Sequence, residues 1–184
     1  MAKTSETLYR VLAYTVMLLG AITLQTTILH FAPFQMIIVD FGLIAVVWIG
    51  LSRGSGAALV VGFLMGLIED SLSGCALGTN ALIKTMVGAL SGTMGGWVLP
   101  NSPVAHLLSL AVCSLLNHIL LYLLLLLTAS SRLSAGGFAM HMVAGTLTTT
   151  VLGMLVFRIL SRIKALKPSR VPEEVVEREW TDAD

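Results

Sequence analysis

Long apolar stretches alternate with short clusters of Gly, Pro, Ser and Asn along almost the whole chain. Such clusters form turns, and short turns make consecutive helices antiparallel neighbours. The apolar stretches cover about Leu8 to Leu29, Met36 to Leu51, Gly56 to Leu72, Asn80 to Leu99, Val104 to Leu127 and Phe138 to Ile159. Stretches of this length are typical of membrane-spanning helices. The pattern therefore predicts an all-α polytopic membrane bundle of about six transmembrane helices.

Two of these stretches are short. The second and third reach only about 24 to 26 Å as helices, against roughly 30 Å for the hydrocarbon core of a bilayer. Their polar ends are therefore expected near or inside the membrane interface. The first stretch is too long for the apolar region of a signal peptide and has no clear cleavage site, so we interpret it as a retained span.

Composition agrees with a membrane location. Hydrophobic residues make up 56% of the chain and charged residues 11%, and the mean hydropathy is +0.90. One soluble core of this size could not bury so much apolar surface. We expect residues 1–166 to form one transmembrane domain and residues 167–184 a polar, acidic cytoplasmic tail. Val175, Val176 and Trp180 give this tail a small apolar edge, which leaves open either disorder or a helix that docks on a partner.

The basic residues indicate an orientation. With the N-terminus in the cytoplasm, six spans leave only Arg132 in an outer loop. The cytoplasmic side then receives Lys3, Arg10, Arg53, Arg158, Arg162, Lys164, Lys167 and Arg170. This bias predicts that both termini are cytoplasmic, and it places Trp48 and Trp97 near the inner interface. Because the basic residues form no stripe, nothing points to a nucleic-acid partner.

Four charged residues lie within the predicted spans, where each costs at least about 2.5 to 3.5 kcal/mol to insert. Asp40, Glu69, Asp70 and Lys84 all fall at a similar depth in the outer third of the bundle, and we call this the polar layer. Gln25, Asn80 and His141 are expected in the same layer. On one interpretation, Lys84 pairs with Glu69 or Asp70, or extends to the interface, and the layer only holds the helices in register. On the other, the layer is a ligand or partner site that opens outward.

Glycines follow a helical spacing in the third and fourth spans. Such stripes let helix backbones approach closely in a membrane. The glycines are Gly62 and Gly66 in the third span and Gly88, Gly92 and Gly96 in the fourth. We expect them to pack these two spans together.

Little in the sequence points to catalysis. No nucleophile motif, metal-ligand spacing or phosphate-binding loop is recognisable, so neither a metal nor a cofactor is expected and the protein is predicted not to be an enzyme. Asn117 and His118 lie in the middle of the fifth span, where we interpret them as an interhelical hydrogen-bonding pair.

The region between Asp40 and Gly92 resembles a known family. It contains Gly62-Phe-Leu-Met-Gly-Leu-Ile-Glu-Asp-Ser-Leu-Ser-Gly74 followed by Leu77-Gly-Thr-Asn-Ala-Leu82. This run resembles the signature of the rod shape-determining protein MreD family, and Asp70, Ser73, Gly74, Leu77 and Gly78 match it. Asp40 and Arg53 bracket the second span as the family's Asp and basic turn residue do. The chain departs from the family pattern at Val39, where Pro is usual, and at Glu69, an additional acid.

The resemblance implies a non-enzymatic component of the bacterial cell-elongation machinery in the cytoplasmic membrane. Such a protein would bind the bitopic protein MreC, and through it MreB and the SEDS glycosyltransferase and transpeptidase pair. The resemblance also implies a fold similar to the S components of energy-coupling-factor transporters. That likeness supplies an alternative function, a vitamin-binding subunit of an ATP-driven transporter. Few aromatic side chains lie near the polar layer, which favours the scaffold.

Overall fold

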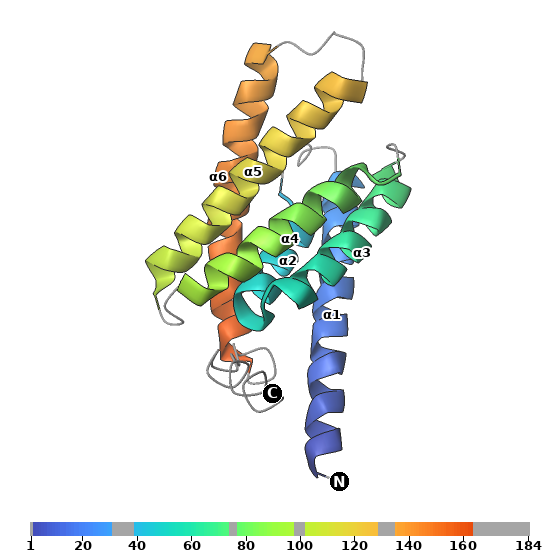
Figure 1. Cartoon of the computed structure of the whole chain (residues 1–184), viewed down its shortest axis with the longest axis vertical. Helices are drawn as coiled ribbons and strands as arrows, with labels where there is room; N and C mark the ends of the chain where they lie inside the picture. The colour runs from blue at the N-terminus through green and yellow to red at the C-terminus, as the bar shows by residue number, and fades with distance from the viewer. Residues whose placement is uncertain (1, 31–38, 74–76, 98–101, 129–134, 164–184) are drawn as a thin grey trace, which may run out of the picture.

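The computed structural model describes residues 2–30, 39–73, 77–97, 102–128 and 135–163, and within these ranges the regular secondary structure is all α-helix (Figure 1). Its helices are α1 (Ala2–His30), α2 (Phe41–Arg53), α3 (Ser55–Ser73), α4 (Thr79–Trp97), α5 (Pro103–Thr128) and α6 (Ala135–Arg162). Each predicted apolar stretch corresponds to one of them. The predicted boundary between residues 166 and 167, and the tail beyond it, lie outside the described residues.

Two predicted boundaries need correction. The second span was expected to begin at Met36, but α2 begins at Phe41, and Asp40 is its N-cap rather than a residue inside the span. The predicted turn from Ser52 to Ser55 reduces to one residue, because α2 continues to Arg53 and α3 starts at Ser55. Gly54 makes this sharp reversal with φ of +91°, a conformation that favours glycine.

Helix α2 forms the centre of the molecule. Every residue from Phe41 to Ser52 is buried, and the helix contacts all five other helices. Its 13 residues rise only about 20 Å, less than the roughly 30 Å of a hydrocarbon core. An apolar helix that is buried all round belongs to a core. The short second span is therefore a core helix that the longer helices enclose.

Trp48 belongs to this core. Its side chain is buried, and its ring packs edge-on against Phe157 of α6 with 5.0 Å between ring centroids. The sequence predicted that Trp48 lies in the aromatic belt at the inner interface. This prediction is wrong, because a belt residue would face lipid headgroups. The side chain of Trp97 lies outside the described residues.

Apolar side chains also cover the outer surface. Exposed Leu, Val, Ile and Met side chains occur on α1, α3, α5 and α6, as expected where lipid is the solvent. Among the described residues, three segments are long and apolar enough to cross a membrane, namely Ser55–Ser73, Pro103–Leu124 and Gly136–Arg162, while Val11–Thr27 and Phe41–Arg53 are shorter apolar helices. The structure thus agrees with a membrane bundle, and the number of crossings and their orientation stay predictions.

Glycines bring α3 and α4 into backbone contact. A Cβ atom added at Gly62 or Gly66 of α3 would collide with the backbone of α4 at Lys84 or Ala81. From the other side, a Cβ at Gly88 or Gly92 would collide with the backbone at Ala58 or Ser55. The expected packing of these spans through small residues is confirmed at these four positions. Gly96 is exposed near the end of α4.

Candidate functional site

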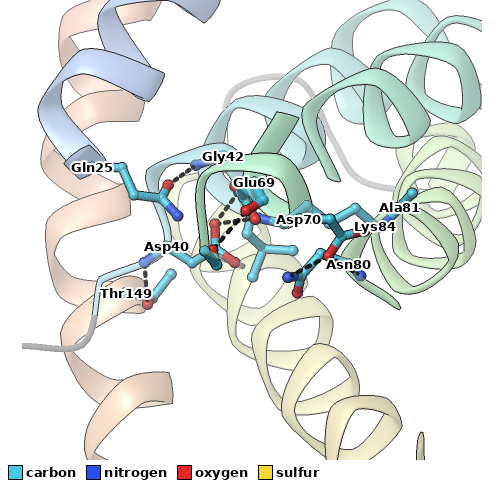
Figure 2. Close-up of polar contacts among 11 residues, drawn as sticks. Gln25, Asp40, Gly42, Glu69, Asp70, Asn80, Ala81, Lys84 and Thr149 are labelled. Carbon is cyan, nitrogen blue, oxygen red and sulfur yellow. Dashed lines mark hydrogen bonds and ion pairs between the residues drawn. The ribbon is translucent and has the colours of Figure 1, made fainter. Parts of the chain in front are cut away.

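A fully buried lysine joins three helices (Figure 2). The Nζ atom of Lys84, on α4, lies 2.5 Å from Oδ1 of Asp40 at the start of α2 and 2.6 Å from Oε1 of Glu69 on α3. We call Asp40, Glu69 and Lys84 the charge cluster. The Lys84 side chain is 0% exposed, so it does not extend to the interface. Its pairing with Glu69 was one of the expected arrangements, whereas its second partner is Asp40 and not Asp70.

Asp40 occupies its place because it caps α2. Its Oδ1 atom accepts a hydrogen bond from the backbone N–H of Leu43 at 2.7 Å, as an N-cap side chain does. The N–H of Asp40 donates to Oγ1 of Thr149 at 3.3 Å, which ties this end of α2 to α6. The N-terminus of a helix favours a negative charge. One carboxylate therefore serves both the helix end and the buried lysine.

Gly42 provides the space for the charge cluster, and the sequence analysis did not identify it. A Cβ atom at this position would collide with Oε1 of Glu69 and lie 3.0 Å from Nζ of Lys84. The N–H of Gly42 donates to Oε1 of Gln25 at 3.1 Å, which brings α1 to the cluster. The available signal was its place two residues after Asp40, in the first turn of α2.

Asp70 has a separate role beside the cluster. Its buried carboxylate accepts hydrogen bonds from the backbone N–H groups of Gly78 at 2.8 Å, Asn80 at 3.0 Å and Ala81 at 3.3 Å. It also accepts one from Nδ2 of Asn80 at 3.0 Å. The first N–H groups of a helix have no partner inside that helix. Asp70 of α3 thus caps the N-terminus of α4 from outside, and Gly78, with φ of +101°, forms the turn.

The other candidates lie around this centre. Ser73 ends α3, where its hydroxyl donates to the carbonyl oxygen of Glu69 at 2.6 Å, and Gly74 lies outside the described residues. Arg53 lies at the other end of α2, where its Nε atom donates to the hydroxyl of Tyr14 at 3.0 Å. His141 is exposed on α6. It is therefore not part of the buried group around Lys84.

The interpretation of Asn117 and His118 as an interhelical pair is wrong for the described residues. Nδ1 of His118 lies 2.8 Å from the carbonyl oxygen of Ser114, one turn earlier on the same helix. Oδ1 of Asn117 is buried without a hydrogen-bond partner. His118 therefore has a hydrogen-bond partner within α5 and not on another helix. Polar side chains in helices often bond to the backbone one turn earlier.

The charge cluster is built to hold helices together. Two carboxylates and one ammonium meet inside the protein, where unpaired charges are very costly. The N–H of Leu43 and the ammonium of Lys84 donate to Oδ1 of Asp40, and the ammonium also donates to Oε1 of Glu69. In the part of the chain that the structure describes, no group of three or more His, Cys, Asp or Glu residues could hold a metal ion.

The fold and the cluster define an all-helical membrane bundle in which a buried lysine is paired with two carboxylates of the same chain. The model of the rod shape-determining protein MreD family matches residues 5–164, and the chain therefore belongs to this family. The match extends far beyond the Asp40 to Gly92 region that carries the resemblance. Comparisons with curated proteins and with solved structures give no significant match.

As a member of this family, the chain is a membrane protein with a role in cell-shape determination. The expected likeness to S components stays a prediction, since no solved structure matches.

Proposed function

We propose that this protein is a non-enzymatic scaffold of the cell-elongation machinery in the cytoplasmic membrane, with both termini in the cytoplasm. In this role it binds an MreC-like bitopic protein. Through that protein it acts with MreB and with the SEDS glycosyltransferase and transpeptidase pair. The family match, which covers most of the chain, supports this role.

The observation that carries the scaffold proposal is the pairing of Lys84 inside the bundle. Lys84 is fully buried, and both of its ion pairs are with side chains of the same bundle. Gly42 is the smallest possible residue beside them, and even one added methyl group would collide with the cluster. The cluster is therefore tightly packed at Gly42, and its chemistry is to keep α2, α3 and α4 in register. The vitamin-binding alternative therefore finds no support here.

The outer surface favours a helical partner. On α5, Ile119, Leu123, Leu126 and Leu127 expose between 45% and 76% of their surface. Helices in lipid associate by packing, because lipid chains are as apolar as leucine. A transmembrane segment of a bitopic protein can pack on this face of α5. Without such a partner, the face contacts lipid.

Co-purification tests the scaffold proposal. The tagged protein, extracted from native membranes in a mild detergent, is expected to retain an MreC-like bitopic protein that mass spectrometry identifies. A variant with Leu123→Asn and Leu126→Asn on α5 should retain less of it. The matched variant Val60→Asn and Leu64→Asn on α3 has similarly exposed positions and should retain a normal amount. Recovery of an ATPase pair and a bound small molecule without any bitopic partner would contradict the proposal.

A further inference from the structure

Four polar side-chain atoms on α5 and α6 are buried without a hydrogen-bond partner among the described residues. They are Oγ of Ser114 and Oδ1 of Asn117 on α5, and Oγ1 of Thr146 and Oγ1 of Thr150 on α6. Ser114, Asn117 and Thr150 are at most 7% exposed. We call these four residues the polar seam. Buried polar groups in proteins nearly always have a partner, so four such groups on two neighbouring helices need an explanation.

The two helices meet at Leu110 of α5 and Gly153 of α6. A Cβ atom added to the glycine would collide with the leucine side chain, and Figure 1 shows α5 and α6 as neighbours. Residues at spacings of three or four and of seven lie on one face of a helix. Ser114 and Asn117 follow Leu110 by four and seven residues, so both lie on the face of α5 that meets α6.

Ring contacts show that the helices are antiparallel and stay together on both sides of the polar seam. Before the seam on α5, His106 packs edge-on against Phe157 of α6 with 6.0 Å between ring centroids. Beyond the seam, Tyr122 stacks on Phe138 at 4.4 Å. A side chain from a partner helix would have to separate the two helices between these contacts to reach the four atoms. The polar seam is therefore internal to the bundle.

Antiparallel packing pairs the members of the polar seam across the two helices. Thr150 and Thr146 precede Gly153 by three and seven residues and share its face of α6. Ser114 therefore comes opposite Thr150, and Asn117 opposite Thr146. Measured from the contact at Gly153, helix rise places the members of each pair within about 2 Å of the same height.

The hydroxyls of the polar seam differ from others in the same two helices. Hydroxyls in helices commonly donate to a backbone carbonyl three or four residues earlier, and Ser109 on α5 and Thr148 on α6 do so. The three seam hydroxyls make no such bond. They are therefore available to a ligand between the helices.

We propose that the polar seam binds water molecules, one bridging Ser114 and Thr150 and one bridging Asn117 and Thr146. A buried water molecule typically makes two to four hydrogen bonds to groups that otherwise lack a partner. Water donates to Oδ1 of Asn117, which only accepts, and it both donates to and accepts from a hydroxyl. The seam groups are all neutral, which favours a neutral ligand over an ion. No lipid tail can hydrogen-bond to these groups, so the bound water links α5 to α6 inside the membrane.

Double-mutant cycles on the full-length protein test the bridge. Ser114→Ala and Thr150→Val each remove one hydroxyl with little change in shape, and the two are combined in a third variant. The unfolding constant is measured by SDS titration in mixed micelles. If water links the two positions, their effects are expected to be non-additive by about threefold or more.

The control cycle combines Ser109→Ala with Thr150→Val. Ser109 is also buried on α5, but its hydroxyl donates to the carbonyl oxygen of Ala105 on its own helix. These two effects should be additive to within about twofold.

Nuclear magnetic resonance detects the water directly. The protein is labelled with ¹⁵N on asparagine and studied in deuterated detergent, so that water is the source of magnetisation transfer. The side-chain amide of Asn117 is expected to show a cross-peak to long-lived bound water. Thr146→Val removes the opposite partner of that water and should weaken the cross-peak at least about twofold, whereas Ser109→Ala should leave it unchanged.

The inference requires both results. Additive effects of Ser114→Ala and Thr150→Val would overturn it, because no ligand would then connect the helices there. Coupling without a water cross-peak would overturn it too, because the side chains would then bond directly to one another. A cross-peak that Thr146→Val does not change would place the water elsewhere and would have the same consequence. Neither measurement needs a partner protein, so the outcome is independent of the scaffold proposal.

Discussion

Lys84 is a fully buried cation, and it is stable there because two carboxylates from different helices meet it. Breaking a buried ion pair by removing one partner costs more than replacing all of its members, since a charge left alone in the interior is the costly state. The single carboxylate of Asp40 also caps α2, so this one residue links a helix end to the charge cluster.

Lys84→Met is expected to destabilise the protein by about 3 to 5 kcal/mol, because it leaves Asp40 and Glu69 without their cation. Adding Asp40→Asn and Glu69→Gln should restore part of the lost stability, as measured by a thermal melt in detergent. The control triple variant replaces Asp40→Asn with Asp70→Asn. It should stay less stable, because Asp40 remains charged and Asp70 loses its role as a cap. Equal melting temperatures for the two triple variants would refute the assignment of Asp40 as the second partner.

Gly42→Ala should cost at least about 1 to 3 kcal/mol, because the added methyl group has no space beside Glu69 and Lys84. Gly20→Ala on α1 is the control, since nothing lies within 4 Å of a Cβ atom there. Alanine favours a helix over glycine, so this variant should be neutral or slightly more stable. Urea or thermal unfolding of both variants in the same detergent measures the difference. Similar losses at the two positions would show that Gly42 is not a space-limiting residue.

At the scale of the elements, α3 and α4 behave as one unit. Their backbones touch through Gly62, Gly66, Gly88 and Gly92, and Asp70 of α3 caps α4 through several hydrogen bonds. Close packing and capping support each other, because the glycines bring the carboxylate within reach of the exposed N–H groups. Asp70, the acid that matches the family signature, thus has a structural role as the cap of α4.

Asp70→Ala is expected to lower stability by at least about 2 kcal/mol, since it leaves buried N–H groups of α4 without an acceptor. Ser71→Ala, at an exposed position on the same helix, should change stability by no more than about 0.5 kcal/mol. Hydrogen exchange should also speed up selectively in the first turn of α4 in the Asp70 variant. Normal protection of that turn would contradict the capping role.

At the scale of the whole molecule, the sequence predicts the helices well and their arrangement less well. Apolar runs and turn residues are local features, so each of the six stretches corresponds to a helix. The shared depth of Asp40, Glu69 and Lys84 follows from helix rise alone, and the structure does bring them together. Hydropathy could not reveal that α2 is enclosed by all the others, because a core helix and a lipid-facing helix are equally apolar.

The sequence by itself determined the class of protein, the helices and the residues from which a buried polar centre had to be made. A charge in a membrane must find a partner, and the chain contains few candidates. Only the tertiary structure decided that Lys84 takes Asp40 and Glu69, that Asp70 caps α4 and that Gly42 leaves the space between them. These choices depend on how close helices distant in sequence approach one another, and that distance is set by side-chain packing across the whole bundle.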